Sequence, residues 1–480
     1  MAATDTPGRV TAMPAVPGPR PLPIVGRRGT KFLFYHDPIA YHRHVYETYG
    51  TLAAFTAGGN KLLIYGPTYN QQVLGQADIF HADRVAAPGP PDSALHRLGS
   101  GLNTMSGEVH RRQRRLIQPA LHRQHVDTYR DTMVAISEQY LAGWRSGQLR
   151  DIAHEMQQLT LCIASTTLFG VDATQDADSL GHLIARWIGL NAHRGVYFFP
   201  VDWPGTPFRR LLRLSDQLEA HIREMLDHKR QHTSGQGDVL ELLLGARDDD
   251  GLGMSEAELI GHTTVLFLAG FETSAVAMTW TLFLLAQHPQ VLGDLVDELI
   301  SVLHGEAPTV AQIASLPLLD QVIKESMRLL PPAIHGGRIA VQPFAMGGYE
   351  FPAGTKVMYS EYITHHMAEL YPQPERFLPS RWAGPAPAPY AYLAFLAGPR
   401  RCLGAEFAML EMKIALSLIL QRFRLALPDQ ARIDRAVRFT LVPKDGMPMH
   451  VLGQDRQFRK VSVRGTIHDL VDLSEHSNVH

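Results

Sequence analysis

The segment Phe395-Leu-Ala-Gly398-Pro-Arg400-Arg-Cys402-Leu-Gly404 decides the fold of this 480-residue chain. It places one cysteine in a loop bracketed by two glycines, directly before an apolar stretch with helical spacing at residues 405–423. A thiolate in such a loop can be stabilised by backbone N–H groups and by the N-terminus of the following helix. Gly398 and Gly404 permit a tight turn there. Cys402 is therefore a candidate metal ligand, and the alternative for a lone cysteine is a buried free thiol.

The spacing Phe-x-x-Gly-x-Arg-x-Cys-x-Gly resembles the haem-binding loop of the cytochrome P450 family, in which a cysteine thiolate ligates the iron. The resemblance implies that Cys402 binds the iron of haem b, iron protoporphyrin IX. It also implies that Gly398 and Gly404 let the backbone approach the macrocycle, that Phe395 shields the sulfur from water and that Arg400 reaches a propionate. Five specified positions within ten residues rarely coincide, so this interpretation is preferred to a free thiol.

Composition narrows the remaining function classes. The chain has only two cysteines, which offer neither a disulfide framework nor a zinc cluster. Cys162 lies in an apolar helical run and is interpreted as a core residue. The 45 basic and 47 acidic residues give no strong field for nucleic acid, so we expect no nucleic-acid partner. A hydrophobic content of 45% is enough for a large core.

The pattern along the chain predicts a mainly α protein with a minor β region, in one large domain. We divide the chain into a flexible N-terminal segment at residues 1–16, a catalytic domain at 17–453 and a polar C-terminal tail at 454–480. A first hairpin is expected within 50–65, strands at 338–341 and 356–359, and a final hairpin from 438–442 and 448–451. Helices are expected at 107–121, 126–144, 152–168, 180–190, 208–232, 238–244, 255–287, 289–303, 318–330 and 405–423.

The N-terminal segment shows no targeting signal. Residues 1–16 are small and polar, and they lack the basic start and apolar stretch of a signal peptide. Residues 263–287 are the one stretch that could imitate a membrane span. Glu272 lies in its middle, and an acid at the centre of a lone span costs about 3 kcal/mol. We therefore expect a cytoplasmic protein without a membrane anchor.

The same long helix carries Ala269-Gly270-Phe271-Glu272-Thr273, which resembles the oxygen-activating motif of the family. A glycine in the middle of a helix costs about 1 kcal/mol relative to alanine, so Gly270 needs a reason. The resemblance implies that the helix opens at Ala269 and Gly270, where dioxygen can lie over the iron, and that Glu272 and Thr273 relay protons. The alternative for Thr273 is a hydroxyl bonded to a carbonyl one turn earlier.

The resemblance also implies a set of cations around the haem propionates. His110 and Arg114 are four residues apart and share one side of a helix. With Arg338 and Arg400 they would neutralise the two carboxylates. The remaining arginines of this helix are either a solvated face or a docking site for an acidic redox partner, and both interpretations stay open for Arg111, Arg112 and Arg115.

A structural cluster is expected beneath the cysteine loop. Glu325 and Arg328 are three residues apart and share a helical face. The resemblance implies that Arg376, in Pro374-Glu-Arg376-Phe, completes a buried Glu-Arg-Arg cluster. Such a buried carboxylate is tolerable only if its donors and acceptors are matched. The alternative for Glu325 and Arg328 is an exposed pair that contributes little.

Together these motifs imply a haem-thiolate monooxygenase with the haem between the long distal helix and the cysteine loop. One oxygen atom of dioxygen would enter an organic substrate, with electrons from a ferredoxin or flavodoxin and its NAD(P)H-dependent reductase. The first alternative is a peroxygenase or hydroperoxide-rearranging enzyme of the same fold. The second is a non-catalytic haem-based sensor or ligand carrier. The acid and alcohol of Glu272 and Thr273 argue against both.

The segments that border the substrate in this family carry few charges here. Apolar walls suit a hydrophobic substrate, and we favour a terpenoid or a fatty acyl compound. His335 is the candidate for orienting an oxygenated end. The alternative for 197–203 is a packed loop or a surface patch. These segments are residues 85–91, 196–203, 267–275, 333–335 and 440–442.

Overall fold

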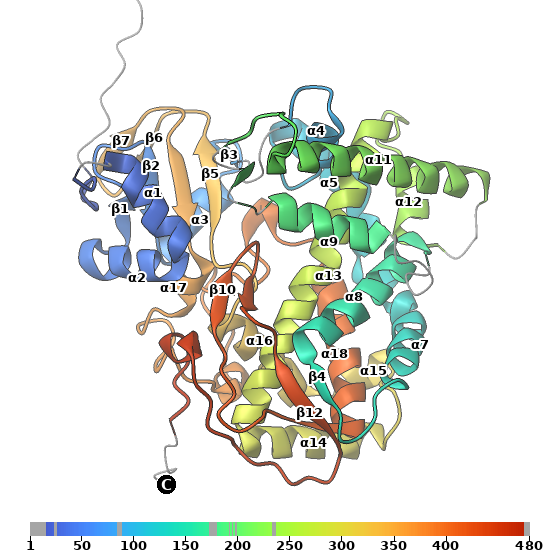
Figure 1. Ribbon diagram of the computed structural model, residues 1–480. Helices are drawn as coiled ribbons and strands as arrows, with labels where there is room; N and C mark the ends of the chain where they lie inside the picture. Colours follow the sequence, from blue (N-terminus) through green and yellow to red (C-terminus); the bar gives the residue numbers. More distant parts are fainter. Residues whose placement is uncertain are drawn as a thin grey trace, which may run out of the picture.

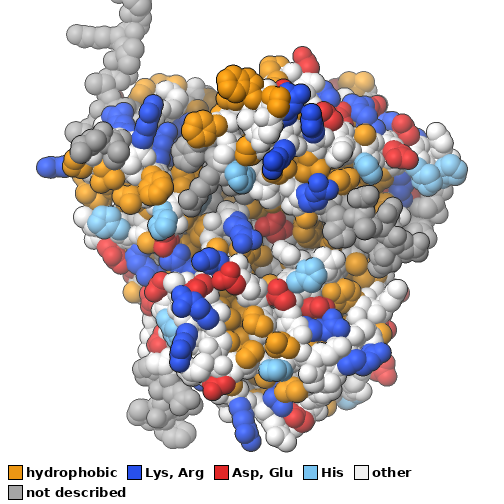
Figure 2. Space-filling model, in the orientation of Figure 1, with side chains coloured by type: hydrophobic (Ala, Val, Ile, Leu, Met, Phe, Trp, Pro, Cys, Tyr) orange, Lys and Arg blue, Asp and Glu red, His pale blue; other side chains and the backbone are white. Residues whose placement is uncertain are grey.

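The computed structural model describes residues 16–23, 26–83, 89–171, 180–191, 193, 195–196, 199–232 and 237–474. Most strands gather beside α1 (Gly26–His36) and α2 (Pro38–Tyr49), and a larger body of helices lies next to them (Figure 1). The predicted mainly α architecture with a minor β region is confirmed. Basic and acidic side chains are interspersed over the face in Figure 2, as the balanced composition predicts.

The long helix α13 (Glu256–Gln287) runs through the centre of the helical body (Figure 1). It begins at a capping box in which Ser255 and Glu258 each bond the other's backbone N–H. The described ranges also contain the helices α3 (Pro67–Gly75), α4 (Ala94–Leu98), α5 (Gly107–Ile117), α6 (Arg123–Val126), α7 (Arg130–Leu141), α8 (Ile152–Phe169), α9 (Leu180–Asn191), α11 (Pro207–Gln231), α12 (Val239–Gly245), α14 (Pro289–Leu303), α15 (Val310–Ile313), α16 (Pro317–Leu329), α17 (Glu361–His365) and α18 (Ala405–Arg422). The same ranges contain the 3-10 helices η1 (Gln118–Leu121), η2 (Asp127–Tyr129), η3 (Pro379–Ala383), η4 (Gly398–Arg400) and η5 (Thr466–Asp469).

Among the described residues, α13 is the one helix that is long and apolar enough to cross a membrane. Its most apolar window is 67% buried inside the protein. The helix packs against α8, α4, α16 and α18. This burial is the packing of a core helix, because its apolar surface is covered by other helices on several sides.

The predicted first hairpin is present and belongs to the largest sheet. Strand β1 (Leu52–Ala54) pairs antiparallel with β2 (Lys61–Ile64). The sheet has the order β1-β2-β8-β5-β3, and its other strands are β8 (Lys356–Tyr359), β5 (Gly336–Ala340) and β3 (Phe80–Ala82). Strands β2 and β8 of this sheet pair in parallel, and the pairings of β1 with β2, β3 with β5 and β5 with β8 are antiparallel. The sheet places Arg338 opposite Val357, which brings that arginine beside Tyr359.

The pairing near the C-terminus differs from the expected hairpin of 438–442 with 448–451. Strand β11 (Leu441–Pro443) pairs with the preceding β10 (Arg435–Val437), because the chain turns tightly where Arg438 N–H donates to the Thr440 carbonyl. Strand β12 (Pro448–Gly453) is left free to pair with β9 (Phe423–Ala426) and β4 (Leu149–Asp151). A further small hairpin joins β6 (Phe344–Met346) and β7 (Tyr349–Phe351).

Both ends of the described chain pack on the domain. The carbonyls of Pro17 and Pro19 accept backbone N–H groups at the end of β1, at Ala54 and Ala57. At the other end the apolar side chains of Ile467, Leu470 and Val471 are buried in the main core. The boundary drawn after Gly453 therefore does not coincide with the end of the packed structure, although residues 475–480 lie outside the described residues.

A buried ion cluster ties α16 to the segment that leads to the cysteine loop. Glu325 and Arg328 are fully buried and form two parallel hydrogen bonds of 2.8 and 3.0 Å. The remaining Arg328 N–H groups donate to the carbonyls of His365, Pro374 and Arg376. Glu325 also accepts from the Leu378 backbone N–H and the Trp382 indole N–H. The pair is tolerable in the core because every charge has hydrogen-bond partners.

The third member of this cluster is Arg381, and the prediction of Arg376 is wrong. Arg381 Nε donates to Glu325 Oε1 at 2.9 Å from η3. The side chain of Arg376 points elsewhere, with Nη1 on Gln373 and Nε 4.0 Å from Asp472. Arg376 contributes its backbone carbonyl instead. The chain turns after Pro374, and this turn carries the arginine five residues later to the carboxylate.

The cluster gives a paired stability test. Arg381→Ala leaves a fully buried Glu325 without one charged partner, which should lower the free energy of unfolding by about 3–5 kcal/mol. Arg376→Ala removes a half-exposed side chain and should change it by less than about 1 kcal/mol. Equilibrium denaturation in urea measures both. Equal losses in the two variants would contradict the assignment of Arg381 to the cluster.

Candidate functional site

Cys402 lies between η4 and the start of α18, in a loop closed by backbone hydrogen bonds. Its N–H donates to the Phe395 carbonyl at 2.8 Å, and the Arg401 N–H donates to the Gly398 carbonyl at 3.0 Å. The residue is accessible at the surface. Protein nevertheless surrounds the sulfur closely, and this desolvation raises the pKa of the thiol. The Gly404 backbone N–H and the positive charges of Arg114 and Arg401 lower that pKa in part, because they stabilise a thiolate.

The two glycines of the loop meet different constraints. Gly398 has φ of +70°, and a Cβ there would lie 2.5 Å from the Leu74 carbonyl oxygen. Gly404 has φ of −84°, and the nearest atom to its Cβ position is Cys402 Sγ at 4.0 Å. The fold of the protein therefore requires glycine at 398, where both the backbone conformation and the space exclude a side chain. It does not require glycine at 404.

His110, Arg114, Arg338 and Arg400 lie close enough to repel one another. Burial and the three arginines lower the pKa of His110 to about 4. Burial, Arg338 and Arg114 lower the pKa of Arg400 to about 10. The residues come from three separate parts of the chain, namely α5, β5 and η4. The expected set of cations is thus brought together, which is costly unless an anion binds among them.

This cation cluster has unfilled hydrogen-bonding capacity that fits the carboxylates of a haem. Within the described part of the chain, none of the three arginines forms an ion pair with an acid, and Arg400 Nε is buried without a partner. The charge of Arg338 acts on Glu361, whose own pKa is raised to about 8 by burial. Arg400 also donates to the Met105 carbonyl and to Ser106 Oγ. The donor set therefore suits two propionates beside a thiolate.

Ser106 is a contact that the sequence analysis missed. It precedes α5 as its N-cap residue and links that helix to the cysteine loop through Arg400. Its hydroxyl also accepts the Ala82 N–H from β3. The Ser106 hydroxyl makes no capping hydrogen bond to α5, so its contacts depend on long-range packing that no local sequence signal marks.

Gly270 has a packing reason in this structure. Helix α13 is continuous from Glu256 to Gln287, so the expected opening of the helix at Ala269 and Gly270 is absent from this conformation. A Cβ on Gly270 would lie 3.1 Å from Leu168 Cδ1 of α8 and 3.7 Å from Ala164 Cβ. The glycine lets α8 and α13 pack closely. Ala269, one residue earlier, is exposed.

Glu272 and Thr273 of this motif form different hydrogen bonds. Thr273 Oγ1 donates to the Ala269 carbonyl at 2.7 Å, which is the bond to the preceding turn named as its alternative. Glu272 is buried, and its Oε1 accepts a hydrogen bond of 2.8 Å from the Thr440 hydroxyl. Burial raises the pKa of Glu272, and the Thr440 hydroxyl and the charge of Arg438 lower it in part. Glu272 can therefore hold a proton near neutral pH more readily than an exposed glutamate.

Several segments expected to border the substrate lie in surroundings other than those expected, or outside the described residues. Residues 85–88 and 197–198 lie outside the described residues. Phe199 and Trp203 are 70% and 69% exposed, as in a surface patch. The His335 ring lies 5.3 Å from the rings of both Phe34 and His42, and burial lowers its pKa to about 4. His335 therefore packs in an aromatic cluster rather than standing free to bind a substrate.

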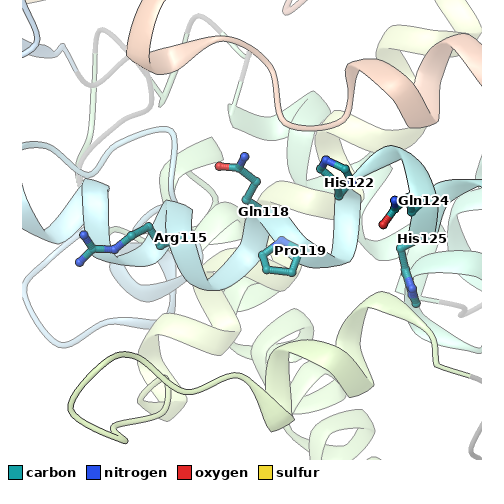
Figure 3. Close-up of a pocket in the computed structure, with 6 residues that line it drawn as sticks. All are labelled: Arg115, Gln118, Pro119, His122, Gln124 and His125. Atoms are coloured by element: carbon teal, nitrogen blue, oxygen red, sulfur yellow. The ribbon is translucent and has the colours of Figure 1, made fainter.

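Two of the three remaining α5 arginines are already paired within the protein. Arg111 bonds Glu108 and Asp78, and Arg112 bonds Asp248. Arg115 lies at the edge of an open groove of about 600 Å³ that follows the end of α5 (Figure 3). The groove continues along η1 and α6, and α6 packs against α18. Its other lining residues are Gln118, Pro119, His122, Gln124 and His125.

Comparison with known families gives a match over most of the chain. Residues 16–448 match the family model described as Cytochrome P450. The matched range contains the cysteine loop, the cation cluster and the central part of α13.

Individual relatives agree with this match. The chain is 30% identical over 442 residues to a cyclooctat-9-en-7-ol 5-monooxygenase of Streptomyces melanosporofaciens, covering 88% of this chain and 92% of the relative. It is 33% identical over 374 residues to a cyclooctatin synthase of the same organism, covering 75% and 79%. Among solved structures, the retinoic acid-bound cyanobacterial CYP120A1 aligns with a TM-score of 0.80 and 26% identity, over 92% of this chain and 100% of that one.

The unequal constraints on the loop glycines give a second paired test. Gly398→Ala should distort the cysteine loop, because its Cβ would overlap the Leu74 carbonyl oxygen and φ of +70° is strained for alanine. Gly404→Ala should be tolerated by the protein fold. Haem bound per protein chain after expression with excess haem precursor is the measurement, with a large loss only in Gly398→Ala. Retention of haem by that variant would show that the loop can shift at Leu74.

Proposed function

We propose, because this chain belongs to the cytochrome P450 family of monooxygenases, that Cys402 is its axial haem ligand and that the enzyme inserts one atom of dioxygen into a hydrophobic small molecule. The observation that carries the proposal is the position of Cys402 beside a cluster of unpaired cations. A thiolate and two propionates together satisfy that cluster, whereas a buried free thiol leaves it unexplained.

The family implies a haem cofactor, and the residues present suit haem b. Cys402 would bind the iron, and His110, Arg114, Arg338 and Arg400 would hold the propionates. Phe395, whose carbonyl fixes the Cys402 backbone, would keep water from the sulfur. When bound, the haem supplies the binding and reductive activation of dioxygen.

Proton delivery is assigned to Glu272 and Thr273. Burial raises the pKa of Glu272, which favours the neutral form of its carboxyl and suits it to deliver a proton. The Thr273 hydroxyl is bonded to the Ala269 carbonyl in the present rotamer, and it would have to turn from this carbonyl to pass a proton onward. Ala269 and Gly270 would border the space that dioxygen enters. An enzyme driven by peroxide alone, or a haem-based sensor, would have no need of this acid and alcohol.

A terpenoid is the favoured substrate class. Two relatives carry the names of a monooxygenase acting on cyclooctat-9-en-7-ol and of a cyclooctatin synthase. The aligned cyanobacterial structure holds retinoic acid. Each named ligand is a large hydrocarbon skeleton with few polar groups, and such a molecule suits a site whose expected borders carry few charges. A fatty acyl compound fits the same apolar walls and is the second choice.

Electrons are proposed to come from separate partners in the cytoplasm. The family implies dioxygen, a substrate and a redox partner, and we favour a ferredoxin or flavodoxin with its NAD(P)H-dependent reductase. Arg115 and the groove of Figure 3 offer a docking surface on the side where α6 packs against α18. Arg112 contributes less to such docking, because Asp248 and the carbonyls of Leu252 and Gly253 already occupy its guanidinium.

The ligand assignment has a spectroscopic test. A thiolate donates electron density strongly to the iron, so the ferrous carbon monoxide complex should show the red-shifted Soret band typical of the family. Cys402→His should abolish this band, while Cys162→Ser should keep it. Persistence of the band in Cys402→His would exclude Cys402 as the ligand.

The substrate class can be tested by spectral titration. Terpenoid alcohols and fatty acids should displace the iron-bound water and shift the Soret band at low concentration, because an apolar site desolvates them at little cost. Small aromatic acids should bind at least tenfold more weakly. Tight shifts only with small aromatic acids or other strongly polar compounds would refute the apolar site. Substrate-dependent NAD(P)H consumption with surrogate partners, compared with peroxide-driven turnover, separates the monooxygenase from the peroxygenase.

A further inference from the structure

The carboxyl of Glu272 is hydrogen-bonded to a residue far away in the sequence. Thr440 lies at the turn between β10 and β11, and its hydroxyl donates to Glu272 Oε1 at 2.8 Å. The Thr440 side chain is 2% exposed and Glu272 is 9% exposed, so water competes little for this bond. Figure 1 shows β10 reaching the central part of the molecule in front of α13 and α16.

The next residue of this hairpin is anchored on two sides. The Leu441 carbonyl accepts the indole N–H of Trp280 on α13 at 2.7 Å. The Leu441 N–H donates to the carbonyl of Pro332, which follows α16, at 2.9 Å. Thr440 is therefore fixed by its neighbour between α13 and the segment before Ala333. Residues 333–335 and 440–442 are both among the segments expected to border the substrate.

We propose that Thr440 is a positioning residue for proton delivery: its hydroxyl holds the Glu272 carboxyl in one orientation and couples the substrate-bordering hairpin to the proton relay. The proposal rests on the function proposed above. Thr440 touches neither the oxygen nor the substrate's reacting atom in this role, and it acts through Glu272 alone.

The bond determines which oxygen carries the proton. Oε1 accepts from Thr440, and in a neutral carboxyl the carbonyl oxygen is the better acceptor. The transferable proton is therefore held on Oε2. Without the hydroxyl, the two oxygens become equivalent and the carboxyl can rotate about a soft terminal torsion. Orientation of the donor would then be lost, although the acid itself remains.

The electrostatic surroundings of Glu272 determine in which direction its pKa shifts when the Thr440 hydroxyl is removed. The groups that act on the Glu272 carboxyl are the Thr440 hydroxyl and the positive charge of Arg438, and both lower its pKa against the raising effect of burial. Arg438 belongs to the same turn as Thr440. Loss of the Thr440 hydroxyl removes one stabilising interaction of the carboxylate, so the pKa of Glu272 should rise further.

The test uses three holoenzyme variants of Thr440, a matched control at another threonine and one variant that identifies the carboxyl signal. Thr440→Val removes the hydroxyl at nearly constant volume, and Thr440→Ser restores it. Thr440→Ala is a second variant for the case in which valine disturbs folding. Thr279→Val is the control, because Thr279 is an equally buried threonine of α13 whose hydroxyl bonds only the Ala275 carbonyl. Glu272→Gln identifies the carboxyl signal.

The first readout is independent of turnover. Infrared difference spectra follow the protonated carboxyl band that disappears in Glu272→Gln. Its titration midpoint should shift to higher pH in Thr440→Val and Thr440→Ala, and it should stay near wild type in Thr440→Ser and Thr279→Val. An unchanged midpoint in both valine and alanine variants overturns the proposal. This shift does not depend on the reaction, so failure of the proposed function and failure of the positioning role are distinguishable.

The second readout is coupling. Product per NAD(P)H should fall roughly tenfold in Thr440→Val, since a positioned acid contributes more than this to proton transfer. Peroxide-driven turnover should change little, because peroxide brings its own protons. In the double variant with Glu272→Gln, Thr440→Val should cause no further loss, since it acts through Glu272. Additive losses, or equal losses in Thr440→Ser and Thr440→Val, overturn the proposal.

Discussion

The site depends on positive charge that has no acidic partner among the described residues. Arg114, Arg338 and Arg400 converge with His110 from α5, β5 and η4, and burial together with these positive charges lowers the pKa of His110 to about 4. Like charges at this distance are unfavourable in a partly buried site, so the arrangement is stable only when an anion joins it. The sheet and the two helices thus bring together positive charges that the two carboxylates of the proposed haem would neutralise. The surroundings of the Cys402 sulfur also favour a bound cofactor. Desolvation raises the pKa of the thiol, so a thiolate there is disfavoured unless a metal ion binds it.

In the ion cluster at Glu325, by contrast, the charged groups are fully hydrogen-bonded within the protein. This difference explains why the cluster has a structural role. Glu325 accepts hydrogen bonds from two arginines, an indole and a backbone N–H, and Arg328 uses all of its donors. Nothing is left for a ligand. The cluster joins α16 to residues 374–382, from which the chain continues to the cysteine loop. A network whose hydrogen-bonding groups are all paired rigidifies its surroundings, whereas a network with unpaired groups can bind a ligand.

The sequence was informative where one local pattern decided the structure. Apolar spacing located α13 and α18 closely, and the loop motif located Cys402 and Gly398. It failed where two segments compete for one partner. Arg376 and Arg381 both follow α16 within one turn-rich stretch, and only the path of the chain selects Arg381. The strand pairing of β11 and the burial of His335 among N-terminal rings are likewise long-range outcomes that no local pattern encodes.

The link between Glu272 and Thr440 shows how such a long-range outcome reaches the chemistry. Thr440 is separated from Glu272 by 168 positions in the chain, yet it is the hydroxyl that orients the acid of the relay. The hairpin that carries it is anchored by backbone bonds at Leu441, and these do not depend on side-chain identity there. The side chains of the hairpin can therefore vary with the substrate while the hydrogen bond to the acid is retained. Under the proposed function, the hairpin borders the substrate and also holds the proton donor, so a substrate that displaces the turn would also displace Glu272.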